Sequence, residues 1–137
     1  MFEQRTQLSV MLENVPGRFG EVCELLYEAG VDILAMTATP IGESGILRMV
    51  VDNAEQAIAG LKERNIPYLQ TEVLVASVPN EPGMAAGLGQ QFSQARVNIE
   101  YTYFSGGQPG TKALLIFKVS DVEDALVRLR RLSDAYN

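Results

Sequence analysis

A tetrapeptide that recurs at long range constrains the fold of this chain more than any other feature. Asn14-Val15-Pro16-Gly17 returns sixty-six residues later as Asn80-Glu81-Pro82-Gly83. At the same spacing, further matches pair Ala29, Val31, Asp32 and Ile33 with Ala95, Val97, Asn98 and Ile99. The match resumes after a connecting loop that is longer in the second copy. Because surface loops tolerate insertions, this pattern indicates a duplicated fold.

Each copy is patterned as strand, helix, strand, strand, helix, and a final strand is clear only in the first copy. Alternating apolar residues predict a strand over 8–12, which Pro16 and Gly17 end. Helical spacing predicts two core-facing stripes, made of Phe19, Val22, Cys23, Leu26 and Ala29, and of Ala85, Leu88, Gly89, Phe92 and Ala95. Further strands are predicted over 31–39, 45–51, 97–104 and 112–119, and second helices over 53–64 and 121–132.

This order of elements predicts an α+β fold of two tandem ferredoxin-like βαββαβ sandwiches, with antiparallel sheets and helices on one face. We place the domains at 1–71 and 72–137, joined without a flexible linker because a strand fits between Pro67 and Val78. Residues 133–137 are too few for a secure closing strand, so the second unit is either three-stranded or borrows an edge. Val50 and Ile116 lie on the face away from the helices, so we expect that face to meet another sheet, within the chain or in a homodimer.

Composition excludes several classes of function. The 137 residues contain no histidine and one cysteine, Cys23, which excludes a zinc site, a Ser-His-Asp triad and an internal disulfide. Eleven basic against 17 acidic residues give a net charge of -6, which disfavours nucleic acid as a partner. No apolar run approaches the ~20 residues that span a bilayer. We therefore expect a cytoplasmic protein with no membrane partner, no metal and no cofactor.

The residues of the repeat resemble the ACT domain, the small amino-acid-sensing module of metabolic enzymes. The first copy carries Glu13-Asn14-Val15-Pro16-Gly17 and then Gly30-Val31-Asp32-Ile33, and the second carries Asn80-Glu81-Pro82-Gly83 and then Arg96-Val97-Asn98-Ile99. The resemblance runs from about Thr6 to about Leu132. It implies a stand-alone tandem ACT protein, regulatory rather than catalytic, that binds a free amino acid between side-by-side units.

A turn that ends a strand and opens a helix leaves N–H groups and a positive dipole end that suit a carboxylate. In domains resembling this one, the ligand is held by the first-strand loop of one unit and the start of the second strand of its neighbour. Carried onto matching positions, the implied ligand-binding residues are Leu12, Asn14, Val15, Pro16, Gly17, Asp32 and Ile33 in the first copy, and Val78, Asn80, Glu81, Pro82, Gly83, Asn98 and Ile99 in the second.

Simpler interpretations of the same residues stay open. The Asn-x-Pro-Gly segment is also a good helix N-cap and turn, and Asp32 and Asn98 also suit hydrogen bonding at the start of a strand. Gly87 and Gly89 lie inside a predicted helix, where they either allow close packing or loosen the helix by roughly 1 kcal/mol each. The Gly106–Lys112 segment lacks the order of a phosphate-binding loop and is better interpreted as a hairpin connection.

The two predicted pockets differ from each other. Leu12 and Val78 are apolar at positions where family members that bind a polar amino acid can carry a polar residue, and Asp32 is an acid where the second copy has Asn98. We therefore expect an apolar amino acid, whose side-chain pocket Tyr101, Tyr103 and Phe104 could shape. The alternative is a protein–protein interaction adaptor or a regulatory subunit of a metabolic enzyme, with no small-molecule ligand. For the protein itself we expect a homodimer, with a metabolic enzyme as a further candidate partner.

Overall fold

The computed structural model describes residues 1–13 and 15–135, and within them the chain divides into two compact units. The N-terminal unit is Thr6–Thr71. The C-terminal unit combines Met1–Arg5 with Glu72–Asn137. The first five residues thus belong to the unit that contains the second half of the sequence.

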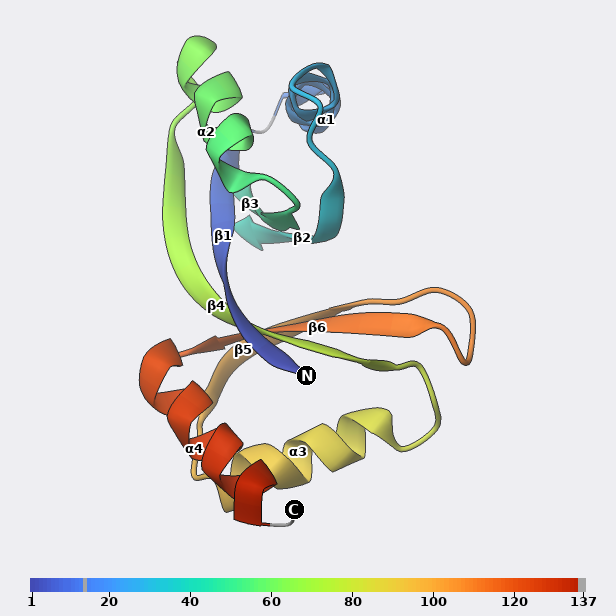
Figure 1. The fold of residues 1–137 in the computed structure, drawn as a ribbon. Helices are drawn as coiled ribbons and strands as arrows, with labels where there is room; N and C mark the ends of the chain where they lie inside the picture. Colours follow the sequence, from blue (N-terminus) through green and yellow to red (C-terminus); the bar gives the residue numbers. More distant parts are fainter. Residues whose placement is uncertain (14, 136–137) are drawn as a thin grey trace. The chain divides into compact units, whose positions relative to one another are not determined.

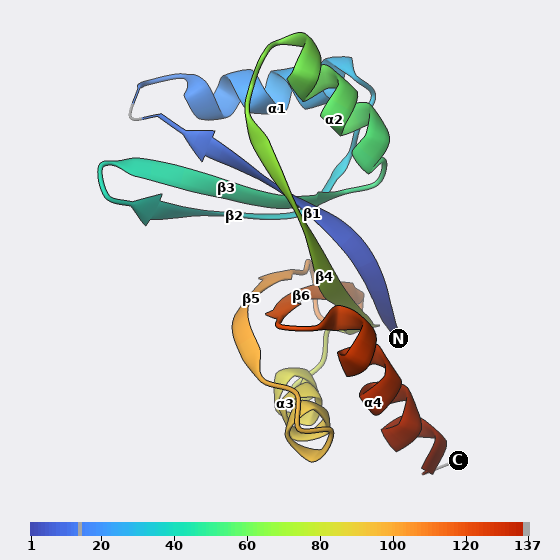
Figure 2. The ribbon, with the colours of Figure 1, turned by 90° about the vertical axis from the view of Figure 1, so that its left-hand side faces the viewer.

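The N-terminal unit is a sheet covered on one face by two helices (Figures 1 and 2). Its elements are the C-terminal part of β1 (Phe2–Leu12), α1 (Arg18–Glu28), β2 (Ile33–Ile41), β3 (Ser44–Val51), α2 (Ala54–Glu63) and the first residues of β4 (Tyr68–Pro79). The strand order is β2-β3-β1-β4, and β3 is antiparallel to both β1 and β2. This is the order of a ferredoxin-like βαββαβ sandwich, in which α1 and α2 face the sheet together.

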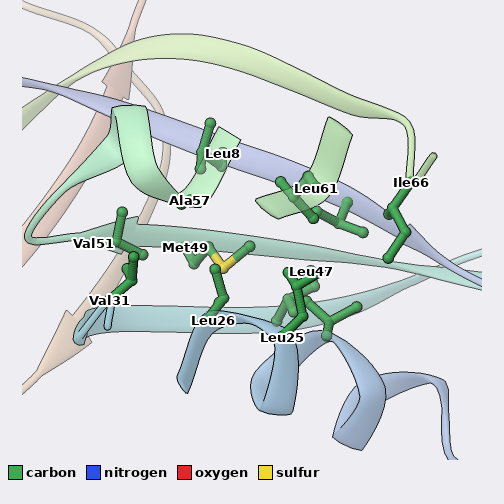
Figure 3. Close-up of a cluster of buried hydrophobic side chains, with 12 residues drawn as sticks. Leu8, Leu25, Leu26, Val31, Leu47, Met49, Val51, Ala57, Leu61 and Ile66 are labelled. Carbon is green, nitrogen blue, oxygen red and sulfur yellow. The ribbon is translucent and has the colours of Figure 1, made fainter. Parts of the chain in front are cut away.

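The core of this unit lies between the helices and the sheet, as Figure 3 shows. Leu26 and Leu61 point from α1 and α2 toward Leu47 and Met49 on β3, and these side chains are buried. The predicted stripe of α1 is partly wrong, since Phe19 is 45% exposed whereas Leu25 is buried. The stripe centres on Leu25 and Leu26, which leaves Phe19 at its margin.

The C-terminal unit repeats this architecture with helices α3 and α4 on one face of its sheet (Figure 1). Its remaining elements are the rest of β4, α3 (Met84–Gln94), β5 (Ile99–Ser105), β6 (Lys112–Val119) and α4 (Val122–Ala135). The strand order is β1-β4-β6-β5, and β6 is antiparallel to both β4 and β5. Two ACT-like βαββαβ units and an α+β class are therefore confirmed.

The N-terminal end of β1 occupies the position of the final strand in the C-terminal unit. The backbone N–H of Ser77 donates to the carbonyl of Met1 at 2.9 Å. Phe2 packs its ring edge against Phe92, with centroids 5.9 Å apart, and Phe92 contacts Phe117 at 4.5 Å. Of the two alternatives that the sequence left open for this unit, the structure shows the borrowed edge.

The apolar residues on the other face of the third strands are also buried. Val50 and Ile116 alternate with the core-facing Met49 and Phe117 along β3 and β6, and both are fully inaccessible to solvent. That a second sheet covers this face stays a prediction. Across the described part of the chain, none of the helices combines the length and apolarity needed to cross a membrane.

Gly87 and Gly89 lie in α3, as predicted, but the close-packing explanation for them is wrong. A Cβ atom built at either glycine would have no heavy atom within 4 Å outside the helix's own neighbouring backbone. Because nothing approaches these positions, the remaining effect of the glycines is to weaken the helix through their greater backbone freedom.

Candidate functional site

The two repeated loops each end in a glycine that begins a helix. Gly17 precedes α1 with φ of 92° and Gly83 precedes α3 with φ of 85°, a left-handed conformation that favours glycine. Glycine has no side chain, so neither cap residue supplies an oxygen to the first turn of its helix. Asn80 is therefore not the N-cap of α3, and Asn14 lies outside the described residues.

The start of α3 presents backbone donors in a first turn that contains no acidic residue. The N–H of Met84 donates to the carbonyl of Glu81 at 3.1 Å, and the N–H of Gly87 donates to Gly83 at 2.9 Å as the first intrahelical bond. The N–H groups of Ala85 and Ala86 lie between these two donors, on exposed residues, at the positive end of the helix dipole. The first turn of α3 contains no acidic residue. A carboxylate is the natural acceptor for such a pair of amides.

The start of α1 is different because charged side chains surround it. Arg18 forms ion pairs with Glu13 and Glu21, each at 3.1 Å. The hydrogen bond and charge of Glu13, followed by the charge of Glu21, raise the pKa of the Arg18 guanidinium above its ordinary value. Glu21 also lies in the first turn of α1, where it already complements the helix dipole. A ligand carboxylate would meet two glutamates here, one of them in the first turn of the helix, whereas the first turn of α3 has none.

Asn80 connects the loop before α3 to the hairpin between β5 and β6. Its side-chain amide donates to the carbonyls of Gly107 at 3.1 Å and Gln108 at 3.4 Å. Its backbone N–H donates to Thr111 at 2.7 Å, and its carbonyl accepts from Gly110 at 2.8 Å. The amide nitrogen, which is the donor atom of this side chain, is therefore directed at the hairpin, and the side-chain oxygen is what remains to face a ligand.

Several predicted residues of the second copy line one cavity of about 280 Å³. Val78, Glu81, Pro82 and Gly83 form one side of it. The other lining residues are Met1, Pro79, Met84, Gly87, Leu88 and Gln91. The cavity therefore lies at the start of α3, and its wall combines apolar side chains with one carboxylate.

Two further cavities lie beside the predicted loops. In the N-terminal unit, a cavity of about 310 Å³ is lined by Leu12 and Glu13 together with the β2–β3 hairpin. In the C-terminal unit, a cavity of about 300 Å³ is lined by Ser77, Val78, Pro79, Gly110 and Lys112. Val15, Pro16 and Gly17 do not line the first of these, so the structure gathers the predicted loop residues more completely in the second copy than in the first.

The remaining predicted residues lie at the opposite end of each sheet. Leu12 pairs with Gly45 on β3, whereas Ile33 pairs with Val51, six residues further along. At about 3.4 Å per residue, that separation is about 20 Å. In the second copy Ile99 likewise pairs with Val119 at the far end of β6 from Lys112. Within one unit, the loop and the start of the second strand thus do not meet.

Asp32 uses its backbone to join strand ends. Its N–H donates to the Asp52 side chain at 2.9 Å, and its carbonyl accepts from the Asp52 N–H at 3.0 Å. The Asp32 residue itself is exposed, as is Asn98 at the matching position. These contacts agree with the interpretation of Asp32 as a hydrogen-bonding residue at the start of a strand and leave its carboxylate facing solvent.

The aromatic residues of β5 do not share one face of the strand. Phe104 pairs with Leu115, which faces the helices, whereas Tyr103 pairs with Ile116 on the other face. Strand alternation therefore places Tyr101 with Tyr103 and separates both from Phe104. The expectation that all three shape one side-chain pocket is wrong. The Phe104 ring instead lies over Gly106, where a Cβ atom would overlap it.

Sequence reasoning missed the hairpin between β5 and β6 as part of this region. Gly110 and Lys112 line a cavity with Val78. Among the residues that the structure describes, Asn80 forms four hydrogen bonds with the hairpin. The available signal was the greater length of this hairpin in the second copy, which by itself indicated only a tolerated insertion.

Comparison with known proteins identifies the family. The family model described as an ACT domain pair matches residues 4–132, and the chain belongs to this family. A solved structure of a Bacteroides thetaiotaomicron protein has 29% identity and a TM-score of 0.85, and the match covers 96% of this chain and 90% of that one.

Two further solved structures are similar in fold. The regulatory subunit of aspartate kinase from Thermus thermophilus, in its ligand-free form, has 17% identity and a TM-score of 0.66, over 96% of this chain and 94% of that one. The same subunit from Thermus flavus has 17% identity and a TM-score of 0.65, and the match covers 100% of this chain and 96% of that one. No curated protein matches the chain.

Proposed function

We propose that this ACT domain pair is a regulatory protein, without catalysis of its own, that binds a free amino acid where ACT-like units meet. The observation that carries the proposal is the start of α3, where Gly83 and Met84 line a cavity of about 280 Å³ and the next two residues of the first turn are exposed. Membership of the ACT domain pair family supports a regulatory role. Ligand acts by favouring one arrangement of the units, since an effector shifts an equilibrium by its differential affinity.

The chemistry of the α3 loop matches the two ends of an α-amino acid. The N–H groups of Ala85 and Ala86 suit the carboxylate, and the carboxylate of Glu81 on the cavity wall suits the ammonium group. Val78, Met84 and Leu88 supply an apolar wall of the same cavity. These walls favour an apolar side chain over a charged one, because burying an unpaired charge is costly.

The proposed site uses more than one unit. Asp32 and Asn98 begin the second strands, about 20 Å along the sheet from the loops of their own units. A complete site therefore takes its loop and its strand start from different units, and a homodimer supplies the additional units. A metabolic enzyme is the proposed target, and the similarity in fold to a regulatory subunit of aspartate kinase supports an enzyme of amino-acid metabolism as the first to test.

A thermal-shift screen against the twenty amino acids at millimolar concentration tests the proposal. A ligand at ~100 times its dissociation constant adds about 2.7 kcal/mol to the free energy of unfolding, which corresponds to a shift of several degrees. One clear responder supports an amino-acid sensor and gives its specificity. Uniform silence contradicts the proposal and favours an adaptor that binds a protein partner.

Glu81→Gln tests the orientation of the ligand. Loss of the carboxylate should weaken binding of the responding amino acid by about tenfold, because a charge-assisted hydrogen bond is replaced by a neutral one. Glu123→Gln on α4 is the matched control, since Glu123 is an exposed glutamate that does not line the cavity. Equal affinities for the two variants would contradict the assignment of the ammonium group to Glu81.

A further inference from the structure

Asn80 is placed in the proposed site by its position in the repeat, but its hydrogen bonds point elsewhere. Its side-chain amide nitrogen donates to the hairpin carbonyls of Gly107 and Gln108. Its backbone N–H and carbonyl bond to Thr111 and Gly110 of the same hairpin. A ligand carboxylate needs a donor, and the donor atom of this amide already bonds to protein carbonyls.

The hairpin that Asn80 holds has a second anchor of its own. The Thr111 hydroxyl donates to the carbonyl of Gln108 at 2.6 Å, and the Thr111 N–H donates to the same carbonyl at 3.2 Å. Segment 106–110 is exposed and glycine-rich, so it has high conformational freedom without such bonds. The bonds from Asn80 therefore restrict the position of a segment that its own composition leaves flexible.

The held hairpin borders the proposed ligand region. Gly110 and Lys112 line a cavity of about 300 Å³ with Val78 and Pro79, and the latter two also line the cavity at the start of α3. Pro79 pairs with Lys112 in the sheet, which fixes the base of the hairpin beside the loop. Beyond this paired base, the side chain of Asn80 bonds to Gly107 and Gln108 of the hairpin.

We propose that Asn80 is a positioning residue, which clasps the β5–β6 hairpin against the loop before α3 so that the hairpin forms a wall of the amino-acid site. This inference rests on the proposed function for the ligand, whereas the clasp itself is a property of the ligand-free protein. We thus attribute the effect of Asn80 on ligand binding to the hydrogen bonds that its amide N–H groups make with the hairpin. A contact between this amide and the ligand carboxylate is not part of the proposal.

An isosteric substitution separates the donors from the acceptor. Asn80→Asp keeps the size and the acceptor oxygen of the side chain but replaces both N–H donors with an oxygen that faces the carbonyls of Gly107 and Gln108. Hydrogen exchange of the Gly110 and Thr111 amides, followed without ligand, should accelerate by about tenfold or more in this variant and in Asn80→Ala. Unchanged exchange in both variants would overturn the clasp.

Amino-acid affinity of the folded variants then tests the wall. Asn80→Asp and Asn80→Ala should each weaken binding of the amino acid found in the thermal-shift screen by about tenfold. Asn80→Gln, which retains the donors, should bind more tightly than Asn80→Asp. If the side-chain oxygen contacted the ligand ammonium directly, Asn80→Asp would bind as well as the unsubstituted protein or better, and that result would overturn the proposal.

Two further variants serve as controls. Asn53 caps α2, and its oxygen accepts from the N–H of Gln56 at 3.1 Å, so Asn53→Asp keeps the bond and should change neither measurement. Thr111→Val removes the hydroxyl bond within the hairpin without touching Asn80, and it should loosen the hairpin and weaken binding together. Full affinity in Thr111→Val with a loosened hairpin would contradict a hairpin wall.

Failure of the proposed function gives a different result from failure of the clasp. If the unsubstituted protein binds none of the twenty amino acids, the amino-acid site and its hairpin wall are both refuted. The clasp is still decided by the exchange of the Gly110 and Thr111 amides, which requires no ligand.

Discussion

The two units share one architecture, yet the loops that begin their first helices have diverged in chemistry. At the start of α1, Arg18 forms ion pairs with Glu13 of the preceding loop and with Glu21 of the first helical turn. The first turn of α3 contains no acidic residue, and the loop before it is hydrogen-bonded to the β5–β6 hairpin. The comparison shows that the same backbone arrangement can carry paired charges at the start of one helix and no acidic residue in the first turn of the other.

The units also differ in how their cores are filled. Phe92 occupies the position in the C-terminal unit that Leu26 holds in the N-terminal unit, and both side chains are buried. We expect Phe92→Ala to cost about 3–5 kcal/mol and Leu26→Ala about 2–5 kcal/mol. Hydrogen exchange resolved by residue should show each loss in its own unit. Equal loss of protection across both units in either variant would show that the cores do not unfold separately.

Phe2 tests whether the first residues of the chain belong energetically to the distant unit. Phe2→Ala removes the ring contact with Phe92 and should cost about 1–2 kcal/mol, since Phe2 is only partly buried. The amides of β6 and α4 should lose protection from exchange, whereas those of α1 and α2 should not. Loss of protection in α1 would contradict the placement of Met1–Arg5 in the C-terminal unit.

Glycines of α3 and its cap should respond in opposite directions. Gly89→Ala fills open space in the helix and should stabilise the protein by about 1 kcal/mol. Gly83→Ala forces an L side chain to adopt φ of 85° and should destabilise it by about 1–2 kcal/mol. Urea unfolding measures both. Stabilisation by Gly83→Ala would show that the left-handed cap is not required.

Cys23 gives the smallest expected effect, at the position where the other unit has Gly89. Partial burial raises the pKa of its thiol, so the folded protein favours the neutral form. The unfolded chain then ionises first, and stability falls as pH rises above the thiol pKa of the unfolded chain. The difference in melting temperature between pH 7 and pH 9.5 should be slightly smaller in Cys23→Ala than in the unsubstituted protein. An identical pH dependence would contradict the shift.

Much of the fold could be predicted from the repeat and from apolar periodicity. β3 and β6 begin and end within one residue of their predicted bounds, because apolar residues mark both strands in the sequence. The N-terminal extension of β1 was missed because residues 2–6 contain Phe2 as their one large apolar residue, and Ser77, which bonds Met1, is remote in sequence.

The candidate site was predicted less completely for a physical reason. The loop residues follow from Pro16, Gly17, Pro82 and Gly83, since proline and glycine mark turns. The partners of the Asn80 side chain are backbone carbonyls. Every residue has a carbonyl, so no side-chain pattern in the sequence predicts these bonds. The predicted stripe of α1 failed at Phe19 because periodicity gives spacing but not which edge of the stripe the sheet covers.

The placement of Met1–Arg5 beside β4 has a consequence for the order in which the chain assembles during synthesis. These residues are synthesised before Thr6–Thr71, and their hydrogen-bonding partner at Ser77 follows only after the whole of that segment has been made. The N-terminal unit can therefore complete its sheet before the part of β4 that pairs with Met1–Arg5 has been made. Closure of the C-terminal unit joins segments that are made before and after Thr6–Thr71, and we expect this step to be slow because its contacts are remote in sequence.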